Sequence, residues 1–124
     1  MDAWMTPVTE ETLARGLTKP FLFLFSELWP TEKNQAVFDR LQQHSSPASR
    51  VVTILGTDHY DFSDLPALTP LAPQLGLKGP IQGARVQTIV NAYSLAFFDQ
   101  LLKGQATTLL DGPSAAYPEV RFDR

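Results

Sequence analysis

Several chemistries are excluded by residues that this chain of 124 amino acids lacks or has in small number. It contains no cysteine, so it has no disulfide, no thiolate metal site and no cysteine nucleophile. Its two histidines, His44 and His59, lie far apart and not at metal-ligand spacing, and no metal site is expected. No glycine-rich phosphate-binding loop is visible, and no cofactor is expected. The longest apolar run, Phe21 to Phe25, is too short to span a bilayer.

Charge is also modest, with 19% charged residues and a formal net charge of −3. A mildly acidic chain without lysine and arginine clusters has little attraction for nucleic acid or anionic membranes, so neither partner is expected. The first residues lack the basic and apolar stretches of a secretory signal, which leaves a cytoplasmic or a secreted location open, depending on upstream sequence. A hydrophobic content of 44% suffices for one small globular domain.

The apolar pattern predicts a unit of strand, helix and strand. Residues Phe21–Phe25 are apolar on both faces, which is typical of a parallel strand covered by helices on both sides. A buried turn of helix is the alternative for this run. A helix is expected from Glu32 to Gln43, and a second strand from Val51 to Leu55. A right-handed crossover between two parallel strands is the default connection for such a unit.

Further elements are expected on either side of this unit. Thr9 is expected to cap a short helix that ends near Ala14, and a long helix is expected from Gln82 to Lys103. The tail from 111 to 124 contains two prolines and is expected to be irregular, with a short strand at 108–110 as an option. Helical spacing gives the long helix a core face that comprises Ile89, Tyr93, Ala96, Phe97 and Leu101.

These elements do not make a complete α/β domain. A strand that is apolar on both faces requires neighbouring strands and helices on both sides. Left alone, the pair would expose unpaired strand edges, through which the chain could associate with itself. We therefore expect an α/β fold with an incomplete sheet, the rest of which is missing or supplied by another chain.

His59 is the main candidate for chemistry. It follows the second predicted strand, and ligands of open α/β sheets gather outside the carboxyl ends of the strands. A histidine at this place can accept a proton near neutral pH. The alternative is a loop histidine that bonds to a nearby backbone group.

Asp2 is the second candidate, because an acid that orients a histidine must be fixed at the end of a strand or in the following loop. It lies one crossover upstream of the first predicted strand. The alternative is an exposed aspartate at a frayed terminus. Asp58, Asp61 and Asp64 lie close to His59 in sequence and are expected to be loop or helix-capping residues, because an orienting acid usually comes from another strand.

No serine of the sequence has the setting of a catalytic nucleophile. The pattern Gly-x-Ser-x-Gly between a strand and a helix does not occur. Ser114 in Gly-Pro-Ser-Ala-Ala lacks the last glycine and follows the histidine, whereas the hydrolase order is serine, acid, histidine. Ser26, at the end of the first predicted strand, is interpreted as structural.

Three segments in linked order resemble the platelet-activating-factor acetylhydrolase family, a group of α/β-hydrolases similar to the dienelactone-hydrolase-like esterases. The first is Asp-Ala-Trp-Met at Asp2, the second is the apolar strand that ends in Ser-Glu at 26–27, and the third is Gly-x-x-His-x-x-Phe-x-Asp from Gly56 to Asp64. The helix around Tyr93 is similar to the closing helix of that family. The resemblance covers residues 1–110, so the whole chain, 1–124, is expected to be one partial domain, the carboxy-terminal portion of an α/β-hydrolase fold.

The resemblance implies that Asp2 is the acid and His59 the general base of a Ser-His-Asp triad. It implies calcium-independent hydrolysis of phospholipids with short or oxidised sn-2 acyl chains, through an acyl-serine intermediate. The family's serine and oxyanion-hole amides lie upstream of Asp2, so these 124 residues alone are expected to be inactive. Two other hypotheses stay open, which are a non-catalytic binding module derived from the fold and a hydrolase of soluble esters or lactones.

Overall fold

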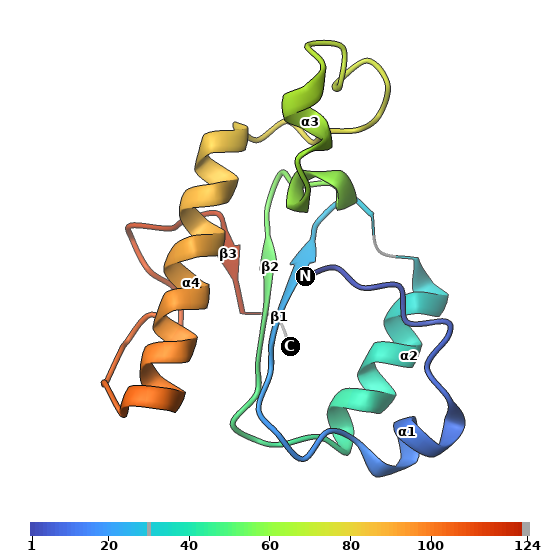
Figure 1. Ribbon diagram of the computed structural model, residues 1–124, viewed down its shortest axis with the longest axis vertical. Helices are drawn as coiled ribbons and strands as arrows, with labels where there is room; N and C mark the ends of the chain where they lie inside the picture. Colours follow the sequence, from blue (N-terminus) through green and yellow to red (C-terminus); the bar gives the residue numbers. More distant parts are fainter. Residues whose placement is uncertain (30, 123–124) are drawn as a thin grey trace.

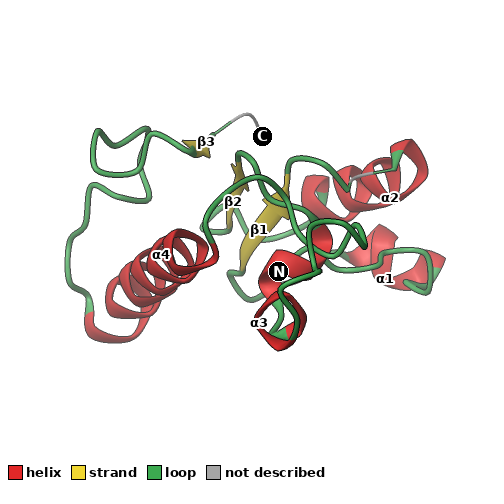
Figure 2. Cartoon of the chain, turned by 90° about the horizontal axis from the view of Figure 1, so that it is seen from above, coloured by secondary structure: helices red, strands yellow, loops and turns green. Residues whose placement is uncertain are grey.

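The computed structural model describes residues 1–29 and 31–122. It has three layers, with a small twisted sheet between one long helix and a pair of shorter helices. Figure 2 shows helix α4 (Gly83–Lys103) on one side of the sheet and helices α1 (Glu10–Arg15) and α2 (Glu32–Gln43) on the other. The expected α/β class with a partial sheet is therefore confirmed.

The predicted unit of strand, helix and strand is present. Strand β1 (Leu22–Ser26) runs parallel to strand β2 (Arg50–Ile54), with Leu22 opposite Arg50 and Ser26 opposite Ile54. Helix α2 connects them and has the predicted bounds, because the side chain of Thr31 accepts a hydrogen bond from the backbone N–H of Asn34 and fixes the first turn. Since the strands are parallel and in register, their carboxyl ends meet at the same edge of the sheet.

A third strand joins the sheet at a place that the sequence did not indicate. Strand β3 (Val120–Arg121) pairs antiparallel with β2, which gives the order β1-β2-β3. The strand considered at 108–110 is wrong, because these residues form a bend and a turn, in which Asp111 N–H bonds to Thr108 O at 3.2 Å. The tail is therefore not wholly irregular, since its last described residues extend the sheet.

Each face of the sheet has its own hydrophobic core. On one face, Leu24, Val52 and Ile54 pack against α4 through Ile89 and Tyr93. The burial of Ile89, Tyr93 and Phe97 confirms the predicted helix face in part. Leu101 is exposed, and Val86 at the other end is buried instead, because α4 covers the sheet mainly with its first four turns.

The opposite core is aromatic. Phe23 and Phe25 of β1 pack on Phe38 of α2, with ring centroids 4.4 Å and 4.8 Å from that of Phe38. Leu13 of α1 and Met5 close this core. Helix α1 begins after Thr9 as predicted and ends at Gly16, whose φ of 67° is a conformation that favours glycine. Together the two cores explain why the central residues of β1 are buried on both faces, as the sequence indicated.

The connection from β2 to α4 forms the upper end of the molecule in Figure 1. It contains the single 3₁₀ turn η1 (His59–Phe62) and the short helix α3 (Leu65–Leu68). The amino-terminal segment runs beside β1 before it turns away toward α1 (Figure 1). The fold thus brings residue 2 and residue 59 to the carboxyl ends of the strands.

Candidate active site

Asp2 is held at the carboxyl end of β1 rather than frayed into solvent. Its side chain is buried, with 1% of the residue exposed. Its backbone N–H donates to Leu24 O at 2.8 Å, and Ser26 donates twice to its carboxylate, from the backbone N–H to Oδ1 at 3.1 Å and from the hydroxyl to Oδ2 at 2.7 Å. The alternative of an exposed terminal aspartate is therefore wrong.

His59 reaches Asp2 from the neighbouring strand end. Its Nδ1 lies 3.1 Å from Asp2 Oδ2, although 57 residues separate the two in sequence. About a third of the imidazole side chain is exposed, whereas the carboxylate is not. A carboxylate accepts hydrogen bonds only, when it is ionised, so this contact places a proton on Nδ1 and leaves the lone pair on Nε2. The structure therefore brings together the two residues that the sequence singled out.

The loop that carries His59 is fixed by the aspartates that the sequence assigned to capping. Asp58 caps the 3₁₀ turn through the backbone N–H of His59 at 2.6 Å. Asp61 Oδ2 accepts from the backbone N–H of Asp58 at 2.9 Å and from that of Gly79 at 2.7 Å. The capping interpretation is confirmed for Asp58 and Asp61, while Asp64 makes no side-chain capping hydrogen bond to α3. These bonds hold the histidine in a rigid turn.

Two tryptophans lie beside the imidazole of His59, a contact that was not expected from the sequence. The ring of Trp29 stacks on that of His59, with centroids 4.3 Å apart and an interplanar angle of 27°. Trp4 lies against Trp29, with centroids 5.6 Å apart. An aromatic ring stacked on an imidazole limits the rotation of that imidazole. A signal was available, since both tryptophans closely follow the residues Asp2 and Ser26.

Ser26 and Glu27, at the end of β1, each make hydrogen bonds that hold the candidate site together. Ser26 holds Asp2, as described above. Glu27 Oε2 accepts from the backbone N–H of Gly56 at 2.8 Å, and Leu28 N–H donates to Thr57 O at 3.1 Å. These bonds continue the contact between β1 and β2 beyond the regular sheet, so the strand ends that bear Asp2 and His59 are tied to each other.

Ser114, the nearest sequence match to a nucleophile, has a structural part instead. Its backbone forms an isolated bridge with Tyr117, and its hydroxyl accepts from the backbone N–H of Ala116 at 3.3 Å. It lies in the turn that leads to β3 and makes no described contact with Asp2 or His59. Among the described residues, the acid is in contact with Ser26, whereas no recorded hydrogen bond joins a serine to His59.

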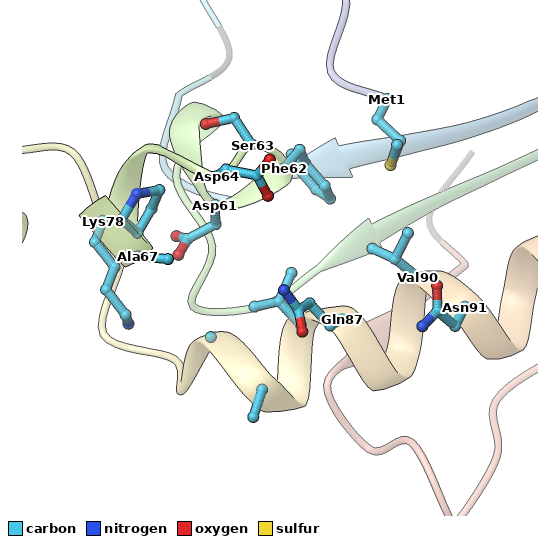
Figure 3. A pocket seen from close by; sticks show the side chains of 14 residues that line it. Met1, Asp61, Phe62, Ser63, Asp64, Ala67, Lys78, Gln87, Val90 and Asn91 are labelled. Atoms are coloured by element: carbon cyan, nitrogen blue, oxygen red, sulfur yellow. The ribbon is translucent and has the colours of Figure 1, made fainter. Parts of the chain in front are cut away.

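A cavity of about 520 Å³ lies next to the histidine loop, between that loop and the first half of α4. Phe62 and Asp61 enter it from the loop, Lys78 from one end and Met1 from the other (Figure 3). Val86, Gln87, Val90 and Asn91 line its α4 side. The cavity is thus partly apolar and partly polar, and it begins one residue away from Asp2.

Among residues 1–29 and 31–122, no helix is long and apolar enough to cross a membrane. The same part of the chain holds no group of three or more histidine, aspartate or glutamate side chains placed to bind a metal ion.

A carboxylate and a histidine are the residue types that α/β-hydrolases use as acid and base, and here they lie at the ends of adjacent parallel strands. The fold agrees, because a ferulic acid esterase from Streptomyces cinnamoneus superposes with a TM-score of 0.75 and 30% identity over 90% of this chain. Residues 1–109 match the family described as platelet-activating factor acetylhydrolase, isoform II. The chain belongs to this family, and the resemblance found in its motifs is confirmed.

A curated relative supports the same assignment. The platelet-activating factor acetylhydrolase of Gallus gallus is 30% identical over 104 residues, which are 82% of this chain. The match spans only 24% of the chicken protein, and the match to the ferulic acid esterase spans 35% of that chain. The 124 residues therefore correspond to a part of each relative, and an activity of the whole protein is a matter of proposal.

Proposed function

We propose that this chain supplies the acid and the general base of a serine esterase that hydrolyses phospholipids with short or oxidised sn-2 acyl chains. The observation that carries the proposal is the contact of 3.1 Å between His59 Nδ1 and the buried carboxylate of Asp2. The family and the esterase-like fold support the reaction class. The substrate class rests on the family to which the chain belongs.

The pair of Asp2 and His59, called the dyad below, determines the order of proton transfers. With Asp2 accepting from Nδ1–H, the Nε2 of His59 takes the proton of a serine hydroxyl as its oxygen attacks the ester carbonyl. The tetrahedral intermediate then collapses, and Nε2–H protonates the departing alkoxide of the lysolipid. Water then enters, gives a proton to the same Nε2 and attacks the acyl-serine. When the second tetrahedral intermediate collapses, the carboxylic acid is released and Nε2–H returns its proton to the serine oxygen, which restores the serine and the neutral histidine.

The serine and the oxyanion-hole donors are proposed to come from a segment that precedes Asp2 in the complete protein. The sequence contains no Gly-x-Ser-x-Gly, and Ser114 lies in the turn before β3. The order serine, acid, histidine of the hydrolases agrees with an upstream position. We expect the 124 residues alone to be inactive, because loss of a triad nucleophile lowers the rate by roughly a millionfold.

The test supplies the missing part. The segment of the chicken relative that precedes its matched region, in which the proposal expects the serine, is mixed with or fused to this chain, and assembly is checked by light scattering. We expect hydrolysis of a short-chain sn-2 phospholipid only in the assembled form, and His59→Ala to lower the rate at least about a thousandfold. His44→Ala is the matched control, because His44 lies at the end of α2 with its Nδ1 on Arg40 O. An assembled form that is inactive, or activity that survives His59→Ala, would contradict the proposal.

The same assay separates the substrate classes. Soluble esters and lactones are tested beside the phospholipid, since the part of the pocket that would select among them is not formed by the described residues alone. Preference for a soluble ester would retain the roles of Asp2 and His59 and change the substrate.

A non-catalytic binding module is the second candidate, and the cavity of about 520 Å³ favours it. Phe62, in the loop that carries His59, lines this cavity and offers an apolar ring to a bound molecule. A chain that is a well-folded monomer, and that remains inactive when assembled with the serine-bearing segment, would support the module. Aggregation or obligate oligomers would support a domain that needs completion.

A further inference from the structure

We propose that Ser26 is a positioning residue for the catalytic acid, because its hydroxyl holds the carboxylate oxygen that faces His59. The inference rests on the proposed function, since it assigns Asp2 its catalytic orientation. From its sequence alone, Ser26 is interpreted as structural, because Glu27-Leu28 and not a glycine-bearing turn follows it. The geometry gives it a more specific part.

Ser26 contacts both oxygens of the Asp2 carboxylate. Its backbone N–H donates to Oδ1 at 3.1 Å and its hydroxyl to Oδ2 at 2.7 Å. Oδ2 is also the oxygen that lies 3.1 Å from His59 Nδ1. One residue therefore fixes the plane of the carboxylate, and its shorter bond goes to the atom that meets the histidine.

Burial makes these two bonds hard to replace. Asp2 and Ser26 are each 1% exposed, so bulk water does not reach the carboxylate. A buried carboxylate needs hydrogen-bond donors in place of water, and bonds to a charged group are stronger than neutral ones. Beyond Ser26 and His59, the recorded hydrogen bonds give the carboxylate of Asp2 no other donor among residues 1–29 and 31–122.

The hydroxyl opposes one particular motion. If the carboxylate turns away from His59, it must break the bond from Ser26 Oγ as well as that from His59 Nδ1. Without the hydroxyl only the second bond opposes this opening. The population of the open state, and with it the exchange of the Nδ1 proton with water, should therefore rise roughly ten- to a hundredfold when the hydroxyl is removed.

The test measures this proton directly by NMR in the 124-residue chain labelled with ¹⁵N. We expect faster exchange of the His59 Nδ1 proton in Ser26→Ala, and an intermediate rate in Ser26→Cys, because a thiol has similar size and is a weak donor. The second variant keeps the test decisive if the first does not fold. Ser45→Ala is the control, since it removes a hydrogen-bonded hydroxyl at the far end of α2, one that accepts from Leu17 N–H and donates to Leu41 O.

The outcomes separate this proposal from the proposed function. If the wild-type His59 carries its proton on Nδ1 and its exchange is the same in the Ser26 variants as in Ser45→Ala, the positioning role is overturned and the dyad stands. If the wild-type ring does not carry that proton, the proposed function fails, and the Ser26 proposal fails with it. A general loss of stability would speed backbone and ring exchange together, whereas the positioning role predicts a change at the ring beyond that of the backbone amides.

Discussion

Asp2 is held in a backbone conformation that an aspartate seldom adopts. Its φ is 44°, and among the described residues it is the non-glycine residue with positive φ. Such a conformation costs on the order of 1 kcal/mol and persists where surrounding contacts enforce it. Here the contacts are the hydrogen bonds with Leu24 and Ser26. The carboxylate of this strained residue contacts His59, so the residue with the unfavourable backbone conformation is also the candidate catalytic acid.

Different features of the sequence pointed to His59 and to Asp2. His59 could be predicted from position alone, because it follows a buried parallel strand. Asp2 needed the family resemblance, since nothing local distinguishes an aspartate next to the first residue. Ser26 and Trp29 were missed as site residues, because hydrogen bonds and ring stacking across 24 and 30 residues depend on the folded chain and leave no periodic pattern.

Gly79 lies so close to neighbouring backbone atoms that there is no space for a Cβ atom. A Cβ at this residue would lie 2.2 Å from Gly56 O and 3.0 Å from Asp58 N, both in the backbone around the histidine loop. Gly79→Ala should therefore destabilise the chain by about 1–3 kcal/mol and displace the loop. Urea unfolding and the NMR signals of His59 measure the two effects.

The matched control is Gly83→Ala at the start of α4, where a Cβ meets no atom within 4 Å. This variant should leave the stability unchanged or raise it by up to about 1 kcal/mol. Equal effects of the two substitutions would show that close packing at Gly79 is not what holds the loop.

Among the elements, those with strong local signals were predicted well. Helix α2 has a capping threonine and an inward face with Phe38, and its bounds match the prediction. Strand β3 was missed because two residues, Val120 and Arg121, carry no pattern, and their pairing depends on β2. The strand at 108–110 was wrong because apolar composition favours a strand only when a neighbour is available.

An ion pair between elements gives a prediction about pH. Arg85 on α4 binds Glu119 before β3 through two hydrogen bonds of 2.7 Å each. The bond from Arg85 holds the pKa of Glu119 below its ordinary value of 4.5. Because the folded-state pKa is the lower one, the pair stabilises the fold above pH 4.5, and this contribution is lost as the pH falls through the folded-state pKa.

Glu119→Gln should therefore lower the free energy of unfolding at pH 7, and the difference from wild type should narrow as the pH falls below 4.5. Urea unfolding over a pH series measures it. A double-mutant cycle with Arg85→Gln isolates the pair from the other contacts of Arg85, with Ala116 O and the ring of Tyr117. A difference that is independent of pH would rule out the ion pair as its cause.

At the scale of the molecule, the chain has a partial α/β fold that corresponds to a part of each relative. The sheet has the order β1-β2-β3, with β2 in the centre and β1 beside the amino-terminal segment. The apolar faces of residues 21–25 predict further strands beside β1, and this stays a prediction. The match to 24% and 35% of its relatives agrees with this view.

The central claim is that Asp2 orients His59 as a base, and Asp2→Asn makes an exact test of it. In the variant, the atom that accepts from Ser26 N–H must be the amide oxygen, so the NH₂ group takes the place of Oδ2 and faces His59 Nδ1. An NH₂ group can only donate, which forces the proton of the ring from Nδ1 to Nε2. Because Nε2 then has no lone pair to accept a proton, the rate of the completed enzyme should fall roughly 10⁴-fold.

The measurement is the ¹⁵N NMR spectrum of the histidine rings of the wild-type chain and of Asp2→Asn, at a pH where the rings are neutral. His44 is the internal reference, because its Nδ1 lies 3.0 Å from Arg40 O, a pure acceptor, and its proton should stay on Nδ1 in both proteins. We predict that His59 carries its proton on Nδ1 in the wild type and on Nε2 in the variant. A His59 protonated on Nε2 in the wild type, or a ring unchanged by the substitution, would contradict the account.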